Sequence, residues 1–192
     1  MTKTSFLHLE VGLARSVPAE LSERLTVFDN GVADTSLDQL FAYIGGYQLQ
    51  EGPCGVAVGT AQQLLSMHRA DPGVVAIASL DTMVDDGVFN EVSRPFVQSH
   101  GYTADATGYM AMVADVYFGR AIAGRIHPMH ACGAVGYHGS FADRGDIVGI
   151  PIRASGELWT SWATNPADLD ALEGQAAALA AEWVNARGRR TT

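Results

Sequence analysis

Apolar residues recur at helical spacing in several parts of the chain, and each such stretch predicts a helix. Between residues 55 and 69 the apolar side chains fall at positions 56, 57, 61, 64, 65 and 67, so they share one helical face. Similar spacing and start signals predict helices over residues 18–28, 36–43 and 107–120, with Gly45 and Gly46 ending the second of these.

The stretch from Asn165 to Ala186 predicts a final helix with a defined start. Asn165 suits the N-cap, and Pro166 suits the first helical position, where no amide hydrogen is needed. We expect one stripe of this helix to be buried, formed by Leu169, Leu172, Ala176, Leu179, Ala180 and Trp183.

Other stretches have the pattern of strands. The run VVAIASL (74–80) is continuously apolar and of strand length, which predicts a buried central strand after the turn at Asp71-Pro72-Gly73. Residues 4–15 and 147–152 also predict strands, and a tight turn at Ser155-Gly156 leads into alternating residues 157–162. The fold class expected from these elements is α/β (α+β), with a central antiparallel sheet flanked by helices.

The order of these elements predicts a division of the chain. Residues 1–52 differ in character from the rest and are interpreted as an N-terminal helical extension, which ends where Gly52 and Pro53 break the chain. Residues 53–188 are expected to form one ligand-binding domain. Residues 189–192 are expected to be a disordered tail.

Composition excludes several classes of protein. The chain has 192 residues, 47% hydrophobic and 17% charged, with a formal net charge of -9. A packed core is therefore expected, whereas non-specific nucleic-acid binding, which needs clustered Lys and Arg, is not. Cys54 and Cys132 do not form a disulfide framework, and no secretory leader or run of about 20 apolar residues is present. We therefore expect a cytoplasmic protein that does not enter a membrane.

Four stretches together resemble a GAF-type small-molecule-sensing domain. They read ADPGVVAIASLD (70–81), GRAIAGRIHPMH (119–130), IVGIPIRASGELWTSWA (147–163) and DLDALEGQAAALAAEWVNAR (168–187). The resemblance implies a GAF/profilin-like sheet and a ligand such as a nucleotide, a tetrapyrrole, an amino-acid derivative or an aromatic acid. The chain departs from the family pattern near Thr160, where a glycine is replaced, and at Trp159 and Trp162. No residue role is carried over from the family.

The segment 119–140 gathers the residues best suited to chemistry. His127, His130, Cys132 and His138 carry imidazole and thiol groups, which are ligands for zinc, iron or haem, so haem and Zn are the two candidate cofactors. Because Pro128 interrupts a helix, we expect a loop in which these side chains converge.

Two other interpretations of this loop stay open. The histidines can line a pocket and hydrogen-bond backbone carbonyls. Alternatively, Cys132 can act as a nucleophile with His130 or His138 as its base, oriented by Asp143 or Asp146. The glycines between 133 and 139 would let the backbone approach a ligand, since they match no phosphate-binding motif.

These residues lead to two functional hypotheses. The first is a domain that binds and senses a small aromatic, planar or tetrapyrrole molecule and signals through oligomer contacts. Its expected contacts are Tyr109, Tyr117, His127, His130, Tyr137 and His138. A homodimer is expected, formed through the apolar faces of the last helix and the first fifty residues. The alternative is a metal- or thiol-dependent enzyme acting on a small metabolite through the same loop, with Cys132 and His130 as catalytic residues.

Overall fold

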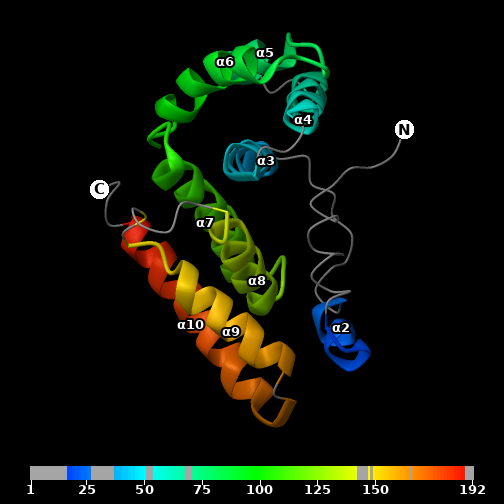
Figure 1. Cartoon of the computed structure of the whole chain (residues 1–192), viewed down its shortest axis with the longest axis vertical. Coiled ribbons are helices and arrows are strands. Elements are labelled where there is room, and N and C mark those ends of the chain that lie inside the picture. The colour runs from blue at the N-terminus through cyan, green and yellow to red at the C-terminus, as the bar shows by residue number, and fades with distance from the viewer. Residues whose placement is uncertain are drawn as a thin grey trace. The chain divides into compact units, whose positions relative to one another are not determined.

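The computed structural model describes residues 17–26, 37–50, 54–67, 71–141, 147, 149–164 and 166–188. In these ranges every regular element is a helix, and no strand is present (Figure 1). The helices are α2 (Ala19–Thr26), α3 (Leu37–Gln50), α4 (Gly55–Ser66), α5 (Pro72–Ala78), α6 (Asp86–Ser99), α7 (Ala106–Ile122), α8 (Pro128–Gly139), α9 (Ile152–Thr164), the 3-10 turn η1 (Pro166–Asp168) and α10 (Leu169–Gly188).

The chain forms two compact units. The first comprises residues 1–33, 114–141 and 149–192, and the second comprises residues 34–113 and 142–148. Helix α7 contributes residues to both, with its first part in the second unit and the rest in the first. We describe each unit by itself.

In the second unit, α4 packs against α3 and α5, and α5 packs against α6. Its core is aromatic: Phe41 stacks on Phe96 with ring centroids 5.2 Å apart, and Tyr47 meets Phe89 edge to face at 5.0 Å. Buried aromatic pairs of this kind add stability beyond the area they bury. They connect α3 to α6, two helices that are far apart in the sequence.

In the first unit, α8 and α9 make the most extensive helix pair, and α10 packs against both. Helices α9 and α10 form an antiparallel hairpin connected through η1 (Figure 1). The core between the helices includes Trp162 and Phe118, both completely buried. This unit contains most of the residues that the sequence singles out for chemistry.

The predicted α/β (α+β) fold with a central antiparallel sheet is wrong, because each of its described strands is helical or without regular structure. Residues 74–80, expected as the central strand, belong mostly to α5. Asp71 caps this helix by accepting hydrogen bonds from the amides of Gly73 and Val74, at 2.8 and 3.2 Å, and Pro72 occupies the first turn. A short apolar run does not separate a buried strand from a buried helix, whereas the Asp-Pro start favours the helix.

The C-terminal part of the predicted sheet is wrong in the same way. The expected turn at Ser155-Gly156 and the expected strand 157–162 both lie inside α9. Of the expected strand 147–152, the described residues before Ile152 form no strand. The GAF/profilin-like architecture implied by the family resemblance is therefore wrong as well.

The helices predicted from spacing fare better. Those over residues 18–28, 55–69, 107–120 and 165–186 correspond to α2, α4, α7 and α10. The helix predicted for 36–43 does not end at Gly45 and Gly46 but continues as α3 to Gln50. Glycine at position 45 leaves room for α7, since a Cβ there would lie 2.9 Å from the Tyr109 carbonyl oxygen. The predicted strand at 4–15, the cap at Asn165 and the tail 189–192 lie outside the described residues.

Candidate functional site

The histidine-rich segment 127–139 forms helix α8 and not the expected loop. Pro128 occupies the first helical position, where its missing amide hydrogen costs nothing, so it begins the helix instead of interrupting it. His127 is the N-cap, and its Nδ1 accepts a hydrogen bond from the Met129 amide at 3.2 Å. A histidine before a proline is an unusual cap, which is why the start was missed.

The glycines of α8 allow close helix packing. A Cβ on Gly136 would lie 2.8 Å from the Gly156 Cα of α9, so the two backbones meet with no side chain between them. Gly139 meets the side chain of Ile152 in the same interface. The glycines therefore allow α9 to pack directly against α8.

A half-buried carboxylate joins several elements of the first unit. Glu173 of α10 accepts a hydrogen bond from the Trp162 indole at 3.0 Å, lies 3.3 Å from the Arg24 guanidinium, and lies 3.6 Å from His127 Nε2. We call these four residues the Glu173 cluster. Arg24 also pairs with Asp170 at 2.8 Å, which ties α2 to the first turn of α10.

The cluster determines the state of His127. Since Nδ1 accepts the Met129 amide hydrogen, the neutral ring carries its proton on Nε2, which faces Glu173. Burial lowers the pKa of His127, Glu173 opposes this change and Arg24 adds to it. Both ring nitrogens have local partners, so His127 connects α8 to α10.

The other predicted donors are also buried. Burial lowers the pKa of His130 to about 4, with smaller contributions from His127 and Arg120, and His130 Nε2 has no hydrogen-bond partner in the described part of the chain. Burial likewise lowers the pKa of His138 to about 4. The His138 ring lies 6.2 Å from that of Tyr117 and 5.7 Å from that of Tyr137.

Cys132 has the properties of a structural thiol. It is completely buried, and burial raises its pKa to about 12, although the neighbouring Ser155 hydroxyl offsets part of the rise. The thiolate is the nucleophilic form, so this environment suppresses nucleophilic reactivity at neutral pH. Cys54 is also buried and free, and its Sγ donates to the Val84 carbonyl oxygen at 3.4 Å.

The predicted ligand contacts fall in both units, and the four predicted metal donors fall in the first. Tyr109 belongs to the second unit, whereas the other predicted contacts belong to the first, where Tyr117 is buried and Tyr137 is exposed. Among the residues that the structure describes, no group of three or more His, Cys, Asp and Glu side chains could hold a metal ion. His127 lies at the N-cap of α8, and His130, Cys132 and His138 lie within the helix.

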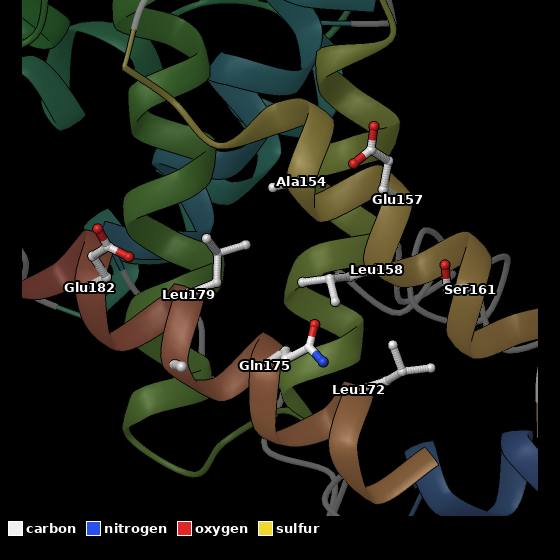
Figure 2. A pocket seen from close by; sticks show the side chains of 9 residues that line it. Ala154, Glu157, Leu158, Ser161, Leu172, Gln175, Leu179 and Glu182 are labelled. Atoms are coloured by element: carbon white, nitrogen blue, oxygen red, sulfur yellow. The ribbon is translucent and has the colours of Figure 1, made fainter. Parts of the chain in front are cut away.

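An open groove lies elsewhere in the first unit, between α9 and α10. Its volume is about 480 Å³. In Figure 2, Leu158 of α9 and Leu179 of α10 point toward the space between the helices, and Gln175 lies between Leu179 and Leu172 along α10. The full lining is Ala154, Glu157, Leu158, Ser161, Leu172, Gln175, Ala178, Leu179 and Glu182.

The sequence contained a signal for this groove. The stripe predicted to be buried on α10 combines two directions: Ala176 and Ala180 are completely buried, whereas Leu172 and Leu179 are only half-buried and line the groove. The sequence of α9 gave no such signal, because residues 157–162 have the alternating pattern of a strand and Leu158 was therefore expected in a sheet.

In comparisons with known proteins, no family model, curated protein or solved structure matches the chain. In the described ranges, no helix combines the length and the apolar character that crossing a membrane requires.

Proposed function

We propose that this chain is a docking module in which the groove between α9 and α10 binds an amphipathic helix of a partner protein. The observation that carries the proposal is an open, leucine-lined groove between two helices of one unit. Helices bind such grooves by placing apolar residues at positions i, i+3 or i+4, and i+7.

The dimensions of the groove suit this occupant. Its lining on α10 runs from Leu172 to Glu182, which corresponds to about 15 Å of helix axis and to about three turns of a bound helix. Leu158, Leu172 and Leu179 are half-buried without an occupant. Burying the remaining surface of each leucine would contribute on the order of 1 kcal/mol of binding free energy.

Polar side chains in the groove have unused hydrogen-bonding capacity. Within the described part of the chain, Ser161 and Gln175 make no side-chain hydrogen bond. Polar side chains at the edge of a bound helix could form hydrogen bonds with both of them. A polar rim around an apolar centre is the usual arrangement of a protein interface.

The volume of the groove also favours a second candidate, a small organic molecule, since about 480 Å³ lies in the range of ligand pockets. The groove is open along its length, however, and a small ligand would leave more of its surface in water than pockets normally allow. We therefore rank the helix first. Thiol-dependent catalysis, the enzymatic alternative, gains no support from a Cys132 whose pKa is raised to about 12.

Location and assembly belong to the same proposal. We place the module in the cytoplasm, because both of its thiols are free and buried. A homodimer stays a prediction, and sedimentation equilibrium of the purified chain would test it.

Selection from a phage-displayed library of amphipathic helices of about 15 residues tests the proposed function. We expect selected peptides to bind the wild type, to lose binding to Leu158→Asp, and to retain it with Leu65→Asp, an equally drastic change at an exposed leucine of α4. Peptides that bind both variants equally, or a library that yields no binder, would contradict the proposal. The neutral probe N-phenyl-1-naphthylamine tests the second candidate: binding that depends on Leu158 without any selected peptide would favour a small molecule.

A further inference from the structure

The rim of the groove carries negative charge on both walls. Glu157 projects from α9 and Glu182 from α10, and both carboxyl groups are visible on opposite helices in Figure 2. The lining contains no Lys, Arg or His. An occupant that approaches the leucines therefore passes between two carboxylates.

The cations nearby neutralise this rim only weakly. Arg153 lies 3.5 Å from Glu157, but the two side chains are 93% and 68% exposed, and ion pairs in such surroundings contribute little. Glu182 has no ion-pair or hydrogen-bond partner in the described ranges. Arg187, one helical turn further along α10, is held by Asp115 at 2.7 Å. Glu182 is thus available to a cation supplied by a partner.

We propose that the occupant of the groove is a basic amphipathic helix, whose apolar stripe covers the leucines and whose Lys or Arg side chains flank that stripe. This inference rests on the proposed docking function and specifies the chemistry of the partner. Long basic side chains suit the geometry, because their methylene groups can cover the leucines while the charged ends reach the rim. The net charge of -9 adds long-range attraction for a basic partner.

Charge also disfavours a second copy of the chain as the occupant. In a symmetric pair formed through this groove, Glu157 and Glu182 of one copy would face the same acidic rim of the other. Like charges brought together across an interface oppose association. A partner of opposite charge avoids this cost.

Two synthetic helices test the charge preference directly. They share one Leu/Ala stripe of about 14 residues and differ at four flanking positions, which are Lys in one and Glu in the other. Fluorescence anisotropy with the full chain should show the Lys helix binding about tenfold more tightly. The preference should fall below about threefold in the double variant Glu157→Gln/Glu182→Gln.

A matched double variant separates the groove from the overall charge. Glu20→Gln/Glu91→Gln removes the same net charge at exposed positions outside the groove and should leave the tenfold preference intact. Equal binding of the two helices, or a preference that only the control variant reduces, would refute the basic partner while leaving the docking function in place. If neither helix binds, or if both still bind Leu158→Asp, the docking function itself is refuted.

Discussion

Replacement of His130 by Met should reduce the loss of stability that this protein undergoes in mild acid. His130 lies in α8, only 4% exposed, and its Nε2 has no hydrogen-bond partner in the described part of the chain. The folded-state pKa of about 4 lies below the ordinary value of 6.5. As the pH falls, the unfolded chain therefore binds the proton first, and the free energy of unfolding decreases between about pH 6.5 and pH 4.

The size of this effect follows from the two pKa values. A group with a pKa of 6.5 when unfolded and about 4 when folded removes about 2 kcal/mol of unfolding free energy between about pH 7.5 and pH 5. His138, whose folded pKa is also about 4, removes a similar amount in the same window. His130→Met should eliminate the first contribution and keep the second. At about pH 7.5 the variant should match the wild type or exceed it slightly, because a buried polar atom without a partner is removed.

Urea unfolding at the two pH values, followed by tryptophan fluorescence, measures this difference. The three tryptophans, Trp159, Trp162 and Trp183, all lie in the first unit, so the signal reports on the unit that contains His130. Met129→Leu, a buried and non-titrating change in the same helix, should show the wild-type dependence on pH. If His130→Met loses as much stability as the wild type, within about 0.5 kcal/mol, the linkage argument for His130 is wrong.

Three substitutions and one chemical modification test the packing of the first unit. Gly136→Ala should lower the free energy of unfolding by about 2 kcal/mol in the same urea assay, because its Cβ would press on the backbone of α9. Gly174→Ala in α10 has open space around it and should raise the free energy of unfolding by up to about 1 kcal/mol. Cys132 should resist iodoacetamide at about pH 8 in the folded protein and react after unfolding, as followed by peptide mass analysis; modification at equal rates would show that the thiol is accessible. Glu173→Gln should lower the free energy of unfolding by about 1 kcal/mol, measured by thermal and urea unfolding, because the Trp162 indole and His127 lose a charged partner; an unchanged stability would show that the Glu173 cluster is not energetically coupled.

The sequence was informative where a helix has one polar side, and it misled where a helix is apolar on most sides. Helix α4 was predicted from its spacing, whereas α5, with Val74, Ile77 and Ala78 buried, has the composition of a central strand. Helix α9 was hidden because Leu158, Thr160 and Trp162 alternate with Trp159 and Ser161 as they would across the two faces of a strand. Tertiary packing decides such segments, and local patterns do not contain that information.

Proline placement was the signal that would have corrected these predictions. Helices or helical turns start at or next to Pro18, Pro72, Pro128, Pro151 and Pro166. A proline in the first turn needs no amide partner and already has the helical φ angle. Interpreting Pro72 and Pro128 as helix starts would have turned the predicted strand 74–80 and the predicted histidine loop into helices.

For the histidine-rich segment 127–139, the sequence shows which residues are present but not how they are arranged. The histidines and Cys132 stand out in the sequence, yet their chemistry depends on burial, which a linear pattern does not reveal. Segment 127–139 is a helix whose glycines allow it to pack closely against α9, so its imidazoles are buried. Burial disfavours the protonated form, and the imidazoles are therefore neutral. The half-buried leucines in the groove between α9 and α10 are then the apolar side chains that a partner can still cover, and for that reason the proposed function lies there and not at the histidines.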